Sequence, residues 1–258
     1  MKTTAIVLAA GQGKRLGSDV AKQYLLLCGR PVLYYTLKNF EDSAVDEIIL
    51  VTGKDQIEYC KREIVEAYGF QKVTKIVPGG KERYHSVALG LEAAQNTSVP
   101  QNAVMMNNSF APHNTAPDYL PCNYVLIHDG ARPFATPGMI ERGIEAVKKY
   151  DACVFGMPVK DTIKIIDEDG FAADTPRRES VWQVQTPQIF AFPLIKNAYD
   201  KLMAEEQRLI GQGIAVTDDA MVMELFSGKR VKLIEGSYEN IKITTPEDLK
   251  IAESFLRK

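Results

Sequence analysis

A glycine-rich segment near the N-terminus contains the residues best suited to chemistry. Gly11-Gln-Gly-Lys-Arg-Leu-Gly17 follows the apolar run Thr4–Ala10, and it carries Arg15, with Lys22 shortly beyond it. Glycines let the backbone come close to a ligand and point its N–H groups at it, which suits an anion. Because fixed cations accompany these glycines, the segment favours a triphosphate or another phosphate-rich ligand.

This segment differs from two familiar phosphate-binding loops. A dinucleotide-binding fingerprint requires a third glycine where this chain has Leu16, and a P-loop requires Gly-Lys-Ser/Thr where it has Leu16-Gly-Ser18. The alternative is a tight surface turn with solvated charges. The cations inside the segment favour phosphate binding over that alternative.

Two further polar clusters follow predicted strands. Gly79-Gly-Lys-Glu-Arg-Tyr-His-Ser86 has paired glycines and a hydroxyl that suit a base or sugar edge, the alternative being an ordinary helix N-cap turn. His128-Asp-Gly-Ala-Arg-Pro133 brings Asp129 and Arg132 to the edge where the first loop lies. A carboxylate there can hold Mg²⁺ beside a phosphate, whereas the alternative is that Asp129 pairs with Arg132 or caps the next helix.

The C-terminal half adds two clusters. Gln185-Thr-Pro-Gln188 is predicted to form a polar turn that places Thr186 near Arg178. Thr217-Asp-Asp-Ala220 is predicted to start a helix, and both of its acids could be caps favoured by the helix dipole.

A last candidate lies upstream of the C-terminal helix. Thr245-Pro246 with Asp248 has the pattern of a helix start, so these residues are explained by structure. Lys242 lies before them on an extended segment and lacks such an explanation. It is therefore a candidate for the site.

The elements that must position these residues alternate between strand and helix. This order indicates an α/β fold with a doubly wound, mostly parallel, Rossmann-like sheet. Ligands of such sheets bind outside the carboxyl ends of the strands, where the polar clusters fall. The predicted strands are 4–9, 47–52, 73–77, 124–128 and 152–157, and the predicted helices are 31–40, 55–68, 84–95 and 139–150.

Composition limits the classes of protein. The 258 residues suit a single domain, 1–258, and the net charge of −2 provides no basic field for nucleic acid or an anionic membrane. The four cysteines are far apart and resemble reduced thiols rather than zinc ligands or disulfides. The N-terminus leaves no room for a signal peptide, and no apolar run approaches a membrane span, so we expect a cytoplasmic protein.

Two segments interrupt the alternation. Residues 96–123 carry several prolines and little periodicity, which predicts an inserted surface loop. Residues 159–185 alternate apolar and polar positions around Asp169-Gly170, which predicts a projecting β-hairpin. An apolar hairpin needs a surface to cover it, and a second copy of the chain is the simplest candidate, so we expect a homodimer.

Taken together, these motifs resemble one family, the cytidylyltransferases that act on 2-C-methyl-D-erythritol 4-phosphate in the non-mevalonate isoprenoid pathway. Each stretch alone is a weak match, but all occur in the order that the family has. The matching stretches are Ala9–Arg15, Lys22–Tyr24, Gly79–Val87, His128–Pro133, Val184–Gln188, Thr217–Ala220 and Asn240–Leu249.

The resemblance implies an enzyme that transfers CMP from CTP to a sugar-alcohol phosphate with Mg²⁺ and releases pyrophosphate. It implies catalytic roles for Arg15, Lys22 and Lys242, and an exchange of the 159–185 arm between the two chains of the dimer. The implied nucleotide-binding residues are Ala9, Ala10, Gly11, Gly13, Gly80, Lys81, Ser86 and Asp129, with Asp129 also near the metal. The implied residues for the second substrate are Thr162, Arg178, Thr186 and Arg132.

The chain departs from the family pattern at Ala21, where proline is frequent, and in the long insert, and neither departure removes a charged group. Ribitol-5-phosphate cytidylyltransferase is an alternative with the same fold and reaction. That branch tends to have a glycine where this chain has Ala10 and a valine where it has Ala131. A nucleotide-binding module without turnover is another alternative. So many charged groups converging on one phosphate favour an enzyme.

Overall fold

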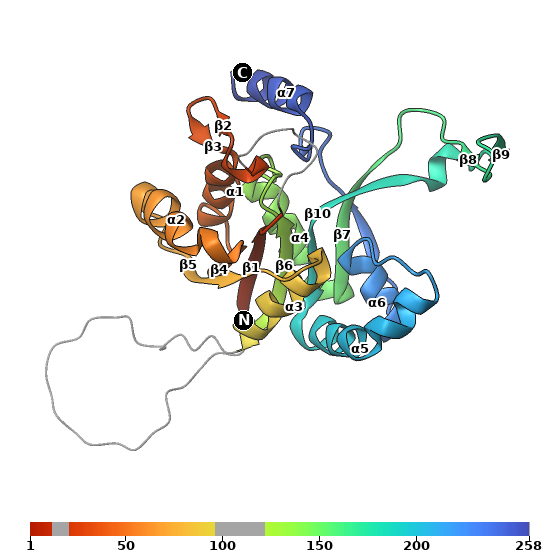
Figure 1. The fold of residues 1–258 in the computed structure, drawn as a ribbon, viewed down its shortest axis with the longest axis horizontal. Helices are drawn as coiled ribbons and strands as arrows, with labels where there is room; N and C mark the ends of the chain where they lie inside the picture. The colour runs from red at the N-terminus through yellow and green to blue at the C-terminus, as the bar shows by residue number, and fades with distance from the viewer. Residues whose placement is uncertain (12–20, 96–121, 258) are drawn as a thin grey trace, which may run out of the picture.

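The computed structural model describes residues 1–11, 21–95 and 122–257, and it confirms the α/β class. A seven-stranded sheet has the order β11-β7-β10-β6-β1-β4-β5, and helices cover both of its faces (Figure 1). Its strands are β1 (Lys2–Ala9), β4 (Glu47–Thr52), β5 (Val73–Pro78), β6 (Cys122–Asp129), β7 (Ala152–Pro158), β10 (Trp182–Ala191) and β11 (Lys232–Glu235).

The main helices are α1 (Val32–Glu41), α3 (Arg83–Gln95), α4 (Pro137–Tyr150), α5 (Phe192–Gly211), α6 (Asp219–Ser227) and α7 (Pro246–Leu256). The predicted helix 55–68 is divided into a 3₁₀ turn (Lys54–Gln56), α2 (Ile57–Tyr59) and a π-helical stretch (Cys60–Glu66). Another 3₁₀ turn covers Lys22–Tyr24, and β2 (Leu26–Leu27) pairs with β3 (Arg30–Pro31).

The middle of the sheet is parallel because β1 pairs in parallel with both β4 and β6. β1 is buried along its whole length except for Leu8, which is partly buried, and this explains why residues 5–9 of the strand are all apolar. The carboxyl ends of β1, β4, β5 and β6 therefore meet at one edge of the sheet. The first glycine-rich loop and the Gly79 and Asp129 clusters follow three of these strand ends.

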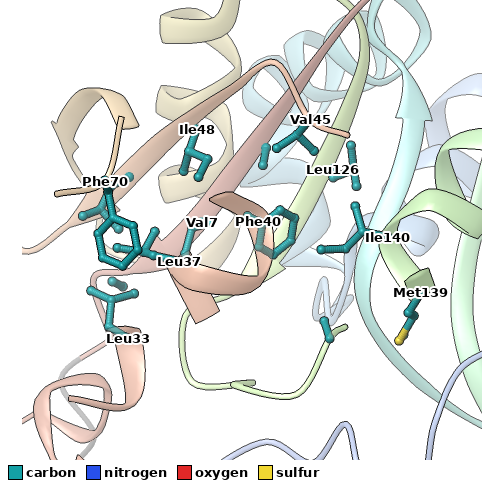
Figure 2. Packing of buried hydrophobic residues seen from close by; sticks show 14 of the residues in the cluster. Val7, Leu33, Leu37, Phe40, Val45, Ile48, Phe70, Leu126, Met139 and Ile140 are labelled. Atoms are coloured by element: carbon teal, nitrogen blue, oxygen red, sulfur yellow. The ribbon is translucent and has the colours of Figure 1, made fainter. Parts of the chain in front are cut away.

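Two hydrophobic layers enclose the sheet. On one face, α1 and α4 pack against the strands through side chains such as Leu37, Phe40 and Ile140 (Figure 2). On the other face, α3, α5 and α6 bury Leu91, Tyr199 and other apolar residues. Helices cover both faces of the strands, so the predicted site residues lie in loops at the edge of the sheet. The packed core fixes the positions of the strand ends from which these loops start.

Strand β10 corrects the prediction of a polar turn at Gln185–Gln188. β10 runs antiparallel to both β6 and β7 and contains this segment, with a shift in register between Val184 and Gln188. Gln188 is buried, and its Oε1 accepts hydrogen bonds from the backbone N–H groups of Asp219 and Ala220, each at 2.9 Å. The side chain of Gln188 thus binds the start of α6 rather than solvent.

The two segments that interrupt the alternation, 96–123 and 159–185, have different outcomes in the structure. β6 begins at Cys122, so the last two residues assigned to the 96–123 insert belong to a strand, and the rest of the insert lies outside the described residues. The predicted hairpin is present as β8 (Ile165–Ile166) and β9 (Ala172–Asp174), and it projects from the sheet (Figure 1).

All four cysteines are free in the structure. Over residues 1–11, 21–95 and 122–257, the structure contains no helix with the length and apolar character needed to cross a bilayer.

Candidate active site

A cavity of about 680 Å³ opens at the carboxyl ends of β1 and β6. Most of the sequence-predicted site residues that the structure describes line it: Ala10, Gly11, Lys22, Gly80, Lys81, Ser86, Asp129 and Lys242. The other lining residues are Leu8, Gln23, Glu82, Arg83 and Ala131. The structure therefore brings together segments that are far apart in the sequence.

Asp129, at the end of β6, is the centre of a charge cluster. Its Oδ2 lies 2.7 Å from Lys242 Nζ and 3.8 Å from Arg132 Nε, and its Oδ1 lies 3.4 Å from Arg83 Nε. Burial opposes ionisation, but Arg83, Lys242 and Arg132 outweigh it and hold the pKa of Asp129 well below its usual range. Asp129 is therefore a carboxylate at neutral pH, surrounded by three cations.

Sequence reasoning missed Arg83 and underestimated Asp219. Arg83, the first residue of α3, donates two hydrogen bonds of 2.8 Å to the carboxylate of Asp219, which is fully buried at the start of α6. Tyr199 on α5 also donates to Asp219, at 2.5 Å. Burial lowers the pKa of Arg83, but the carboxylates of Asp219 and Asp129 outweigh burial and raise this pKa above its usual value. Arg83 therefore stays charged.

Asp218 and Asp219 therefore have different roles. Asp218 is the predicted N-cap of α6, since its Oδ1 accepts from Met221 N at 3.0 Å, while Asp219 forms the buried ion pair. Both Arg83 and Asp219 lie in polar clusters that the sequence marks. No local pattern indicates that residues 136 apart in sequence meet.

The turn Lys22–Tyr24 is fixed beside the end of β1. Gln23 Nε2 donates to the carbonyls of Ala9 at 2.6 Å and Gly11 at 3.2 Å, and the hydroxyl of Tyr24 lies 2.6 Å from Thr52 Oγ1. These contacts place Lys22 at the cavity wall.

The Gly79 loop requires glycine for close packing. A Cβ at Gly79 would collide with the Cβ of Ala10, so a side chain there would push this loop away from the end of β1. The N–H of Gly80 donates to Ser86 Oγ at 3.1 Å. Ser86 therefore supports the loop from the first turn of α3.

Behind Asp129 lies a buried hydrogen-bond chain. Thr186 Oγ1 accepts from the backbone N–H of Asp129 at 3.1 Å and contacts His128 Nδ1 at 3.0 Å, while His128 Nε2 lies 3.0 Å from the carbonyl of Arg132. These contacts favour a neutral ring with its proton on Nε2. Burial lowers the pKa of His128 to about 4.

The remaining sequence-predicted residues lie away from the cavity surface or outside the described residues. Ala9 is buried in β1, Thr186 is buried beneath Asp129, and Arg132 donates to the carbonyl of Asn240 at 2.7 Å. Thr162 and Arg178 lie on the exposed arm, where Arg178 Nη2 donates to Thr162 Oγ1 at 3.1 Å. Gly13 and Arg15 fall outside the described residues.

The cavity suits an anionic ligand. Lys22, Lys81, Arg83 and Lys242 line it beside backbone groups at the end of β1, which is a donor set for phosphates. Within the described ranges, no three His, Cys, Asp or Glu side chains group together as a metal site. Mg²⁺ often binds through one or two carboxylates plus substrate phosphates, and Asp129 is an ionised carboxylate on the wall of this cavity.

Comparison with known proteins identifies similar chains over the full length. The family model described as 2-C-methyl-D-erythritol 4-phosphate cytidylyltransferase matches residues 3–112 and 114–258. The chain is 46% identical over 257 residues to the enzyme of that name from Lachnoclostridium phytofermentans, covering 100% of this chain and 97% of the relative. It is 47% identical over 255 residues to the enzyme from Lachnospira eligens, covering 98% and 99% of the two chains.

Solved structures agree. The crystal structure of 4-diphosphocytidyl-2C-methyl-D-erythritol synthase from Anaerococcus prevotii superposes with a TM-score of 0.77 at 34% identity, covering 100% of this chain and 96% of that one. The 2-C-methyl-D-erythritol 4-phosphate cytidylyltransferase from Thermus thermophilus gives a TM-score of 0.69 at 28% identity, with both chains fully covered.

The buried neutral His128 makes a testable contribution to stability. Its pKa is 6.5 in the unfolded chain and about 4 in the folded one, so between these values only the unfolded chain takes up the proton. The free energy of unfolding should therefore fall by about 2 kcal/mol between pH 7 and pH 5 through this group alone. Urea unfolding of the wild type and of His128→Asn at both pH values measures this difference.

Other titrating groups contribute equally to both proteins, so the comparison isolates His128. An equal loss of stability in the wild type and the variant would contradict the buried neutral ring.

Proposed function

The chain belongs to the 2-C-methyl-D-erythritol 4-phosphate cytidylyltransferase family, and we propose that the cavity at the ends of β1 and β6 is its CTP site. The enzyme transfers CMP from CTP to 2-C-methyl-D-erythritol 4-phosphate in isoprenoid precursor synthesis and releases pyrophosphate. The main support for this assignment is that one cavity is lined by Lys22, Arg83, Asp129 and Lys242.

The family match favours this activity over ribitol-5-phosphate cytidylyltransferase and over a binding module without turnover. The four free cysteines support a cytoplasmic location, where thiols stay reduced.

In the proposed reaction, a phosphate oxygen of the sugar phosphate attacks the α-phosphorus of CTP. A new P–O bond forms, the bond to the β-phosphate breaks, and its electron pair leaves with pyrophosphate. The nucleophile is already an anion, so the chain needs no covalent intermediate. Its task is to hold two anions together and to stabilise the charge that develops in the transition state.

The lysines on the cavity wall suit this task. Lys22, held by the turn at the end of β1, and Lys242, paired with Asp129, would face the α-phosphate from two sides of the site. Arg15 would join them from the first loop. Lys242 is held at 2.7 Å from Asp129, so its ammonium group needs little reorganisation when CTP binds.

The remaining nucleotide contacts follow from the loop positions. Gly80, Lys81 and Ser86 would bind the base and ribose, together with backbone groups of Ala9 and Ala10. Gly11 and Gly13 would contact the phosphates through their backbone N–H groups.

We assign the metal role to Asp129. It is an ionised carboxylate beside the proposed phosphate site, and Mg²⁺ takes most of its other ligands from water and phosphate oxygens, so the donor set fits. When bound, Mg²⁺ would neutralise charge on the phosphates.

The arm supports a homodimer. Ile165, Ile166 and Phe171 on it are 51%, 64% and 72% exposed, and a group of exposed apolar side chains on one segment often marks a protein–protein interface. Thr162 and Arg178 lie on the same arm, away from the cavity of their own chain. In a dimer with exchanged arms, these residues would bind the sugar phosphate in the partner's site, with Thr186 and Arg132 beneath it.

Lys22→Ala should lower kcat for pyrophosphate release about a hundredfold or more, while the Kd of CTP changes much less. The reason is that this cation meets charge that is largest in the transition state. Pyrophosphate release from CTP with 2-C-methyl-D-erythritol 4-phosphate or ribitol 5-phosphate tests the activity. Lys54→Ala is the control, because Lys54 is an exposed lysine outside the cavity. Near-normal kcat in Lys22→Ala would remove its catalytic role.

Asp129→Asn should raise the Mg²⁺ concentration that gives half-maximal activity and should lower kcat, because a neutral amide is a weaker ligand for a hard cation. Chelation of divalent ions should abolish turnover of the wild type. Titration of activity with Mg²⁺ measures both effects. Full activity in chelator would show that no metal is needed.

Arm exchange predicts complementation between two inactive chains. A mixed dimer of Arg178→Ala and Lys22→Ala should regain one intact site, since one cavity then has both native residues. Mixed dimers of Lys22→Ala and Asp129→Asn should be no more active than the average of their two parents, because each cavity carries one defect. Arg177→Ala, an exposed arginine next to Arg178, is the control for the arm.

Activity of purified mixed dimers measures this outcome. If the Arg178→Ala and Lys22→Ala pair is no more active than its parents, each chain completes its own site.

A further inference from the structure

We infer that Glu206 on α5 positions the loop Gly79–Glu82 for the base of CTP, acting through His85 and Tyr84. Glu206 does not line the proposed CTP cavity and has no part in the reaction described above. The inference rests on the proposed function, because that function assigns the base contacts to Gly80 and Lys81.

His85 connects the loop to α5. Its Nδ1 accepts a hydrogen bond of 3.1 Å from the backbone N–H of Glu82, and its Nε2 lies 3.0 Å from Glu206 Oε1. Because Nδ1 is an acceptor, a neutral ring carries its proton on Nε2 and donates it to Glu206. One ring thus bridges a backbone group of the loop and a carboxylate of the helix.

Tyr84 adds a second bond to the same atom. Its hydroxyl donates to Glu206 Oε1 at 2.8 Å, and its ring lies against that of His85 with centroids 4.5 Å apart. Hydrogen bonds from Tyr84 and then from His85 lower the pKa of Glu206, so it accepts both bonds as a carboxylate. Glu206 therefore fixes the orientation of both rings.

On the side of the loop that faces α5, the hydrogen bond from Glu82 to His85 links the loop to Glu206. A second cavity of about 370 Å³ separates the loop from α5, and Lys81 and Glu82 line both this cavity and the proposed CTP cavity. Gly80 lies directly over His85, since a Cβ there would collide with the Cβ of His85. A displaced His85 ring would lose its hydrogen bond from Glu82, the residue that follows Gly80 and Lys81 in the loop, and so would free the loop to move.

The expected effect is on binding rather than on chemistry. Lys22, Asp129 and Lys242 come from other segments and keep their contacts when Glu206 is changed. If the loop occupied its competent position only a tenth of the time, the apparent affinity for CTP would fall about tenfold with the chemical step unchanged.

Three variants test the inference. Glu206→Ala should raise the KM of CTP about five- to tenfold and reduce the preference for CTP over UTP, while kcat and the KM of the sugar phosphate stay within about twofold. Glu206→Gln keeps an acceptor oxygen for both donors and should restore the KM of CTP to near the wild-type value. Glu205→Ala, which removes the neighbouring carboxylate that pairs with Arg208, is the matched control.

Two results would overturn the inference. One is an unchanged KM of CTP in Glu206→Ala. The other is that Glu206→Ala and Glu206→Gln show the same fall in melting temperature and kcat and the same rise in both KM values, which indicates a structural role alone. Calorimetric titration with CTP separates the inference from the proposed function. If the wild type releases no pyrophosphate, the proposed function is wrong. The role of Glu206 is still decided by calorimetry, because the inference requires a higher CTP Kd in Glu206→Ala than in the wild type.

Discussion

The buried carboxylate of Asp129 is the point to which three segments of the chain are tied. Arg83 comes from the start of α3, Arg132 from the turn after β6, and Lys242 from the segment before α7. These cations repel one another, and without Asp129 and Asp219 between them the cost of holding them in a partly buried site would be several kcal/mol. Two carboxylates thus keep a cluster of positive charge assembled at the sheet edge, ready for the charge of a polyphosphate.

The opposite edge of the sheet has a different kind of ion pair. Lys2 and Glu47, on the neighbouring strands β1 and β4, lie 2.9 Å apart and are almost fully buried, and Thr4 donates to the same carboxylate at 2.7 Å. This pair lies at the amino ends of the strands, whereas the cavity opens at their carboxyl ends. Electrostatics at one edge therefore holds the strands in register, while at the other edge it prepares the site.

Much of this arrangement follows from the sequence by simple rules. The apolar runs predict β1 and β4, and the rule that ligands bind at carboxyl strand ends brings Asp129 and the Gly79 loop together. The pairing of Arg83 with Asp219 does not follow, because it depends on how α3 and α6 pack across a face of the sheet. Gln188 was misassigned for a related reason. A polar side chain that bonds a helix N-terminus inside the protein has the same sequence signal as one in a solvated turn.

The position of β10 in the sheet also constrains the order in which the strands can assemble during synthesis. β10 lies between β6 and β7, so a nascent chain that ends before Trp182 has β6 with one unpaired edge and β7 without a neighbour on that side. The strands β1, β4, β5 and β6 can assemble during synthesis, but β7 can join them only after β10 has left the ribosome, and β11 is added at the edge later still. The arm is synthesised between β7 and β10, so the step that joins these two strands also fixes the base of the arm.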